Sequence, residues 1–306
     1  MFKFRRKSFI RRVVEGIVRR RTAKVFGIAI IAFAGWMAEQ KDGQLSSFLN
    51  DNIEAIKGFV TENKQEGKES TFTSSEEYNN FECLASSDYD YIIQHTGFTV
   101  SYDMNTNTPN WVAWELTKEE TYGVVKRTEE FLPDPKVDMS NRVTTEDYKG
   151  SGYDRGHICP AADMKWSVEA MHDCFYMTNI CPQNHNLNRK AWERLEEQCR
   201  QWAREYGKIY ITAGPIYEVG NHKVIGKNCK VTVPEGFYKV VMVPNKGKEK
   251  AIGFFYSNDD KKQTMRQCAL PVDMIEKITG IDFFYNVDMR VQDRIEKELN
   301  IEDWGL

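Results

Sequence analysis

The sequence lacks the cysteine spacing of a small zinc or redox domain. Its 306 residues include seven cysteines, and no two of them form a C-x-x-C pair. This absence disfavours a zinc ribbon and a thioredoxin-like motif, which both need that spacing. The odd number leaves at least one thiol unpaired within a monomer, and the disulfide pattern of the others stays open.

The N-terminal region is poor in acidic residues and short of apolar length. Residues 1–24 contain ten lysines and arginines, and Glu15 is their only acid. The uncharged, mostly apolar stretch that follows covers residues 25–38. As a helix it would span roughly 21 Å, which is less than the ~30 Å hydrocarbon core of a bilayer.

A basic segment before a short apolar one is typical of an export signal, and residues 32–34 (Ala-Phe-Ala) supply a small-x-small cleavage site. If the signal is cleaved, we expect a periplasmic or extracellular protein. If residues 25–38 are retained as a membrane anchor, we expect the folded domain to face outward. Two alternatives stay open. One is a basic amphipathic helix lying on a surface. The other is an organellar presequence, because the segment is Arg-rich and acid-poor, although it is also Ser-poor.

These features divide the chain into three parts. Residues 1–38 form the basic and apolar signal, residues 39–78 a polar linker with a short helix expected over 44–60, and residues 79–306 the folded domain. The whole chain has a formal charge of −3, so the residues after the +9 N-terminal block carry about −12. An acidic remainder argues against a broad nucleic-acid-coating surface, and any polyanion site must therefore be local.

The apolar pattern of the third part predicts an α+β fold. Five segments have strand character, and they are 92–103, 110–117, 208–213, 237–243 and 251–256. One long helix is predicted over 188–206, where apolar residues recur at helical spacing. Because strands and helix do not alternate as βαβ units, the α+β class fits best. The sequence has no internal repeat and no low-complexity tract.

Residues with catalytic chemistry are densest just before the middle of the domain. Gly150, Gly152 and Gly156 free the backbone for a tight turn that approaches a ligand. His157 follows them, and a histidine has an unperturbed pKa close to neutrality, which suits a general base. The alternative is a hydrogen-bonded loop histidine without a catalytic role.

The predicted helix adds three polar side chains. Asn188 opens it, and Glu196 and Arg200 follow at steps of 8 and 12 residues, which advance about 80° and 120° around an α-helix. Their amide, carboxylate and guanidinium groups could hold a hard cation and a phosphate together. Alternatively, Asn188 is only an N-cap, and Glu196 and Arg200 form an exposed pair worth ~0.3 kcal/mol. His172 and His185 fit no zinc template and are expected to be structural or peripheral.

The run RVTTEDYKGSGYDRGH, residues 142–157, closely resembles the D-R-G-H signature of the DNA/RNA non-specific endonucleases. These are ββα-metal (His-Me finger) nucleases, which include secreted bacterial nucleases and mitochondrial endonuclease G. The likeness continues through PAADMKWS, FYMTNICPQ (175–183), LNRKAWERLE (187–196) and AGPIY (213–217). With residues 101–117 and 272–284 it covers about 80–305.

The resemblance implies a mixed or antiparallel sheet with a long catalytic helix packed on it. His157 matches the general base of the family, and Asn188 matches its direct metal ligand. Glu196 matches the acidic residue that positions metal-bound water. The implied cofactor is Mg²⁺, with Mn²⁺ or another divalent ion as alternatives.

The other matching residues concern the substrate. Arg200 matches an arginine that contacts the phosphate, and Arg155 and Asn179 match residues that support the phosphate and the histidine. Arg142 and Asp154 are assigned to substrate binding. The implied partners are DNA and RNA, and the oligomeric state, a homodimer included, stays open.

The implied activity is hydrolysis of phosphodiester bonds in DNA and RNA without sequence preference. Water activated by a histidine attacks beside a single Mg-type ion, and the products carry 5′-phosphates. The main alternative is a non-catalytic, membrane-tethered nucleic-acid-binding module on the same fold. A second is an enzyme with the same apparatus and a narrower substrate range.

Overall fold

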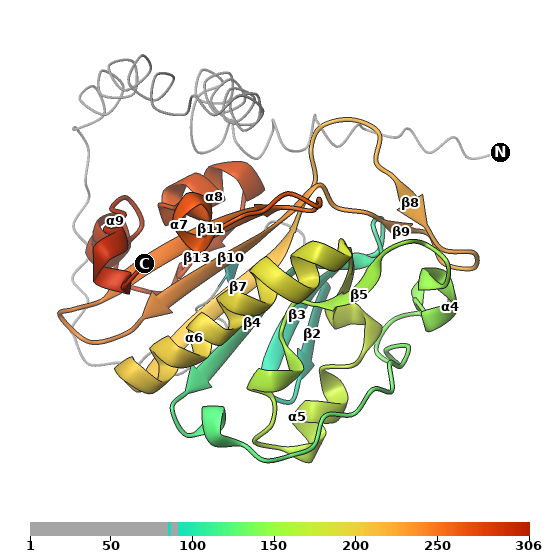
Figure 1. Cartoon of the computed structure of the whole chain (residues 1–306), viewed down its shortest axis with the longest axis horizontal. Helices are drawn as coiled ribbons and strands as arrows, with labels where there is room; N and C mark the ends of the chain where they lie inside the picture. The colour runs from blue at the N-terminus through green and yellow to red at the C-terminus, as the bar shows by residue number, and fades with distance from the viewer. Residues whose placement is uncertain (1–84, 87–90) are drawn as a thin grey trace. The chain divides into compact units, whose positions relative to one another are not determined.

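The structure, a computed structural model, describes residues 85–86 and 91–306, and its centre is a seven-stranded antiparallel sheet (Figure 1). The strands lie in the order β12, β11, β10, β7, β4, β3 and β2. Their bounds are β2 (Tyr91–His95), β3 (Phe98–Asp103), β4 (Thr108–Thr117), β7 (Lys208–Ile216), β10 (Gly236–Val243), β11 (Lys250–Ser257) and β12 (Ala269–Leu270). The predicted signal, the linker and the helix over 44–60 lie outside the described residues.

Four of the five predicted strands are confirmed, in β4, β7, β10 and β11. The prediction of one strand over 92–103 is wrong, because the chain reverses at Gly97, whose φ is +86°. His95 therefore pairs with Phe98 across a hairpin of β2 and β3. The single glycine gave the only signal of this turn, since the residues on both sides have strand character.

One long helix packs on the sheet, as predicted, and it begins irregularly. A π-helical turn, η6 (Leu187–Trp192), leads into α6 (Glu193–Tyr206). The buried residues of α6 include Leu195, Cys199 and Trp202, and the helix lies against β7 and β4. Gly207, with a φ of +85°, ends it.

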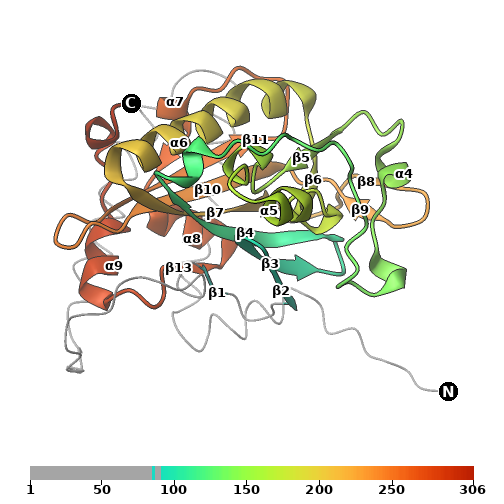
Figure 2. The ribbon, with the colours of Figure 1, turned by 90° about the horizontal axis from the view of Figure 1, so that it is seen from below.

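The two faces of the sheet carry different elements (Figure 2). On one face lie α6, α5 (Val168–Asp173) and the hairpin of β5 (Asp154–His157) and β6 (Ile180–Gln183). On the other lie α8 (Val272–Thr279) and α9 (Met289–Ile295). The shorter elements are β1 (Ala85–Ser86), paired with β13 (Asp282–Phe283); β8 (Val224–Ile225), paired with β9 (Val231–Thr232); α4 (Thr145–Tyr148); and α7 (Met265–Cys268). The predicted α+β class is confirmed.

The core lies largely between α6 and the sheet and is rich in aromatic side chains. Trp114, Trp192 and Trp202 are fully buried, and the ring of Trp192 lies 5.7 Å from that of Phe237. Burying such a side chain contributes about 1.5–3 kcal/mol, so these contacts fix η6 and α6 to the strands. The six cysteines among the described residues are all buried and free.

The described residues belong to one compact unit, Glu77–Leu306. The domain start at residue 79 stays a prediction. Among the described residues, no helix has both the length and the apolar character needed to cross a membrane.

Candidate active site

The D-R-G-H segment forms β5, one strand of a two-stranded antiparallel hairpin. Asp154 lies opposite Gln183 on β6, and His157 lies opposite Ile180. Side chains alternate along a strand, so neighbouring residues of β5 point to opposite faces. The pairing with β6 therefore fixes which residues of the segment can reach the same surface.

The glycines around this strand have two different physical roles. Gly150 and Gly152 have φ values of +71° and +84°, as expected for a tight turn. Gly156 lies within the strand, and its φ is not positive. A Cβ added there would lie 2.2 Å from Oε1 of Gln183. The prediction that Gly156 frees the backbone is therefore wrong, and what it provides is space.

His157 is buried beside two aromatic rings. Only 8% of it is exposed, and its ring centroid lies 5.3 Å from that of Phe131 and 4.7 Å from that of Phe175. Arg155 lies over the ring of Phe131 and Arg127 over that of Phe175, at 4.3 and 5.1 Å from the ring centroids. Burial and these two positive charges lower the pKa of His157 to about 3, so the imidazole is neutral at pH 7.

Asp154 joins the D-R-G-H strand to η6. Nδ2 of Asn188 donates a hydrogen bond to Oδ2 of Asp154 at 2.9 Å, and Nδ1 of His185 lies 3.0 Å from the same oxygen. Although burial raises the pKa of Asp154, these two hydrogen bonds and nearby positive charge lower it overall. Because the amide nitrogen of Asn188 is engaged, its oxygen is the end available to a ligand.

The start of the helix differs from the prediction. Oδ1 of Asn184 accepts hydrogen bonds from the backbone N–H groups of Asn186 and Leu187, so Asn184 satisfies the donors that open the helix. Asn188 lies within the π-helical turn and is not an N-cap. The angles calculated for an uninterrupted α-helix from Asn188 therefore do not apply. Single π-helical turns are frequent at functional sites.

Glu196 and Arg200 are not a simple exposed pair. Nη1 of Arg200 donates to Oδ1 of the buried Asp163 at 3.0 Å, and only 17% of the Arg200 side chain is exposed. Glu196 is half-buried. Burial raises its pKa to about 7, against the opposing charge of Lys239. The exposed-pair interpretation is therefore wrong.

Lys239 was missed by the sequence analysis. It lies on β10 and is fully buried. Its Nζ is 4.5 Å from the ring centroid of Trp192 and 4.9 Å from that of Trp114, and it has no hydrogen-bond partner among the described residues. A lysine in the apolar run FYKVVMV was the available signal, since a buried lysine is expensive unless compensated.

Two predicted site residues hold backbone segments. Asn179 is fully buried; its Oδ1 accepts from the N–H of Cys159, and its Nδ2 donates to the carbonyls of Cys159 and Cys174, all at 2.9 Å. It thereby fixes the chain just after β5. Arg142 donates from Nε and Nη2 to two carbonyls within residues 135–137, at 2.6 and 2.9 Å. Arg155, in contrast, is exposed.

A hollow of about 540 Å³ lies over η6 and α6. It is lined by Arg189, Lys190, Glu193, Arg194, Glu197 and Arg200. Four of these six side chains are basic, so the acidic chain has a local surface suited to a polyanion. Arg200 connects this surface to the residues described above.

The donor set around Asn188 fits a hard cation. Three His, Cys, Asp or Glu ligands within 4.8 Å of one another occur among the described residues only at Asp273, Glu276 and Glu296. Asn188 in η6 offers an amide oxygen, with the carboxylate of Asp154 beside it, and Glu196 in α6 offers a further carboxylate. Mg²⁺ usually keeps several waters and binds through one or two protein oxygens.

Comparisons with known proteins agree with the motif. The model of the family described as DNA/RNA non-specific endonuclease matches residues 77–290. The chain is 35% identical over 210 residues to the mitochondrial nuclease EXOG of Xenopus laevis, covering 64% of this chain and 58% of that protein. It is 33% identical over 203 residues to human mitochondrial endonuclease G, covering 62% and 68%. The crystal structure of an EndoG/EndoGI complex superposes with a TM-score of 0.62 at 28% identity, over 65% of this chain and 87% of that one.

The same comparisons correct the predicted localisation. Relatives from Xenopus laevis, Homo sapiens, Schizosaccharomyces pombe and Mus musculus are mitochondrial nucleases, so the prediction of an exported or outward-anchored protein is wrong. A basic, acid-poor segment is common to export signals and organellar presequences. Composition alone could not separate the two.

Proposed function

The chain belongs to the DNA/RNA non-specific endonuclease family, and we propose that it hydrolyses phosphodiester bonds in DNA and RNA without sequence preference. One observation carries the proposal. The hydrogen bond from Asn188 to Asp154 connects η6 to the strand that bears His157. It brings the element with the proposed metal ligand to the element with the proposed base.

His157 acts as the general base in this proposal. Its pKa of about 3 in the free protein leaves the imidazole neutral, and its buried Nε2 has no hydrogen-bond partner among the described residues. A phosphate bound near Arg127 and Arg155 adds negative charge, which favours the imidazolium and raises this pKa. The histidine then becomes a stronger base when substrate is present.

Asn188 would hold a divalent cation directly, and Glu196 would hold one of its waters. Mg²⁺ is the proposed ion, with Mn²⁺ as the alternative. When bound, it neutralises negative charge on the phosphate oxygens. Asp154 keeps the amide of Asn188 turned with its oxygen outward, and Asp163 orients Arg200.

The arginines supply the contacts to the phosphate backbone. Arg155 and Arg200 contact the reacting phosphate, and the basic side chains of the hollow, such as Arg194, contact its neighbours. Such contacts carry no base information, which accounts for non-specific cleavage. Because water and not a ribose hydroxyl is the nucleophile, both DNA and RNA are substrates, and the products carry 5′-phosphates.

Digestion of circular single-stranded DNA, duplex DNA and RNA, with Mg²⁺ and with EDTA, tests the proposal. All three substrates should be fragmented with Mg²⁺ and stay intact with EDTA. The circular substrate identifies internal cleavage because it has no ends. Binding without cleavage, with either Mg²⁺ or Mn²⁺, would favour the non-catalytic module instead.

A further inference from the structure

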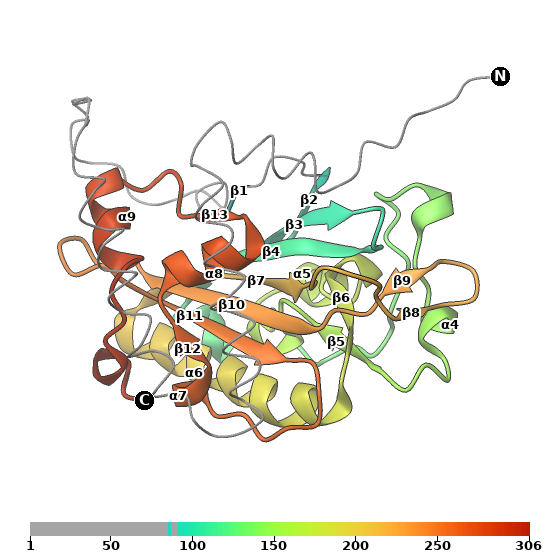
Figure 3. The same ribbon diagram turned by 90° about the horizontal axis from the view of Figure 1, so that it is seen from above.

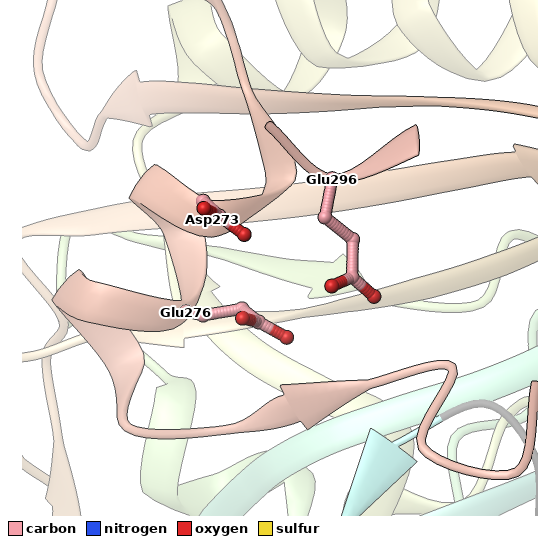
Figure 4. Close-up of side chains that lie close together, drawn as sticks. All are labelled: Asp273, Glu276 and Glu296. Carbon is pink, nitrogen blue, oxygen red and sulfur yellow. The ribbon is translucent and has the colours of Figure 1, made fainter. Parts of the chain in front are cut away.

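A cluster of three carboxylates lies on the face of the sheet opposite α6, where α8 and α9 pack (Figure 3). Asp273 and Glu276 belong to α8, and Glu296 directly follows α9. One oxygen of each lies within 4.8 Å of the other two. Figure 4 shows the three carboxylates turned toward a common point.

Glu296 is the deepest member of the cluster. Only 6% of it is exposed, and its Oε1 is buried without a hydrogen-bond partner in the described part of the chain. Its carboxylate points toward Asp273 and Glu276 (Figure 4). A buried carboxylate oxygen without a partner is costly, so Glu296 needs either a proton or a bound cation.

The basic residues beside Glu296 in sequence are engaged elsewhere. Nη2 of Arg294 lies 2.7 Å from Glu249, and Nζ of Lys297 lies 2.6 Å from Asp293. Burial and the mutual repulsion of the carboxylates raise the pKa of Glu296 to about 8. Burial raises the pKa of Glu276 to about 7 even though the charge of Lys277 opposes that rise. At neutral pH the cluster therefore takes up protons or needs a further positive charge.

The cluster also has a fixed framework. The backbone N–H of Asp273 donates to the carbonyl of Glu296 at 3.0 Å, and the N–H of Phe283 donates to Oε1 of Glu276 at 2.9 Å. The ends of α8 and α9 are thus already held together before any ion binds. Little rearrangement is needed to bring the three carboxylates onto one ion.

We propose that Asp273, Glu276 and Glu296 bind a structural Ca²⁺ ion that links α8 to α9. Carboxylate oxygens are the ligands that this hard cation prefers, at about 2.3–2.6 Å. Oxygens bound to one Ca²⁺ lie at most about 5 Å apart, on opposite sides of the ion, and the three oxygens of the cluster all lie within 4.8 Å of one another. The site is separate from the proposed catalytic residues and does not depend on the proposed function.

Calcium binding to the full chain carrying Asn188→Ala tests this inference, because that background lacks the proposed active-site ligand. Calorimetry at pH 8 should give one Ca²⁺ per chain, and Ca²⁺ should raise the Tm. Adding Glu296→Gln should weaken binding at least tenfold and remove the Tm shift. Glu298→Gln, the same change at an exposed position two residues away, is the matched control and should behave like the background.

The inference would be overturned if the Asn188→Ala chain gave no heat of Ca²⁺ binding and no Tm shift with Ca²⁺. It would also be overturned if the Glu296→Gln and Glu298→Gln variants bound Ca²⁺ equally well. If Glu296→Gln reduces folded yield, Asp273→Asn at the half-buried edge of the cluster replaces it in the same comparison. Cleavage with Mg²⁺ by an otherwise unchanged Glu296→Gln chain should persist. The calcium inference and the proposed nuclease function can therefore be rejected independently of each other.

Discussion

Asp154 is the residue whose role changes most between sequence and structure. The resemblance assigned it to the substrate, yet its carboxylate is engaged by Asn188 and His185. A carboxylate that orients the group beside a metal ligand affects metal affinity more than substrate affinity. We therefore regard Asp154 as a positioning residue.

Asp154→Ala should raise the Mg²⁺ concentration for half-maximal activity about 10–100-fold, because Asn188 is no longer oriented. The KM for DNA should stay nearly unchanged. Metal titrations of cleavage at several DNA concentrations measure both quantities. His185→Ala, which removes the more exposed partner of Asp154, is the control and should have a smaller effect. A higher KM for DNA, with an unchanged Mg²⁺ concentration for half-maximal activity, would instead support a role of Asp154 in substrate binding.

His157→Ala should lower kcat by about 10²–10⁴, because it removes the proposed proton acceptor. DNA binding should be nearly intact, since the flanking arginines remain. Single-turnover cleavage and equilibrium binding on the same preparation separate the two effects. If the His157→Ala variant cleaved DNA as fast as the unchanged chain, His157 would not be the general base.

Lys239 controls the charge of Glu196 in this scheme. Burial raises the pKa of Glu196 to about 7, and the positive charge of Lys239 opposes that rise. The ionised form of Glu196 is the one proposed to hold metal-bound water, so activity should increase as pH rises through this pKa.

Lys239→Met removes the positive charge, which disfavours the ionised form of Glu196 and raises its pKa further. The acidic limb of the kcat/KM profile should therefore move up by about one pH unit.

Lys250 offers a matched control for this experiment. It also lies over two aromatic rings, those of Tyr206 and Trp304, at 4.3 and 4.5 Å. Lys250→Met removes a similar cation–π contact, and Lys250 is not among the charged groups that shift the pKa of Glu196 most. A pH profile that shifts equally in both variants would contradict the role of Lys239.

At the scale of elements, the β5–β6 hairpin and the π-helical turn position the site. The hairpin permits no side chain at Gly156, because Gln183 occupies that space. The π-helical turn places Asn188 against Asp154. Neither element has a hydrophobic period long enough to be predicted from the pattern alone.

Gly156→Ala should destabilise the protein by about 1–3 kcal/mol, because the new methyl group overlaps the Gln183 side chain. Urea unfolding of the variant measures the loss. Gln183→Ala should restore much of it in the double variant, since it removes the colliding atoms. A double variant whose loss is the sum of the two single losses would show that the two positions do not interact.

At the scale of the whole molecule, an acidic chain carries a local basic surface that is suited to a polyanion. The basic residues of the hollow lie over η6 and α6, while the carboxylate cluster lies on the opposite face of the sheet. Binding of nucleic acid through phosphate contacts releases counterions, so affinity falls as salt rises.

Arg194→Gln should weaken DNA binding and reduce the slope of log affinity against log salt by about one, if Arg194 contacts one phosphate. Fluorescence anisotropy of Asn188→Ala chains, which bind without cutting, at several salt concentrations measures the slope. Lys277→Gln on α8, on the other face of the sheet, should leave it unchanged. Equal slopes for both variants would mean that the hollow does not bind the backbone.

The sequence by itself determined the family, the α+β class, four of the central strands and the helix that bears Glu196 and Arg200. These follow from short motifs and from periodic burial, which are properties of neighbouring residues in the chain. The targeting prediction failed because a basic, acid-poor segment is typical of both export signals and organellar presequences.

Only the tertiary structure decided which groups meet. The contact of Asp154 with Asn188 and the burial of Lys239 between two tryptophans join residues far apart in sequence. The same holds for the approach of Glu296 to α8. Such contacts depend on strand register and helix packing, and local sequence constrains these weakly. Charge, burial and pKa depend on these contacts, so the chemistry of the site became definable only once the chain was folded.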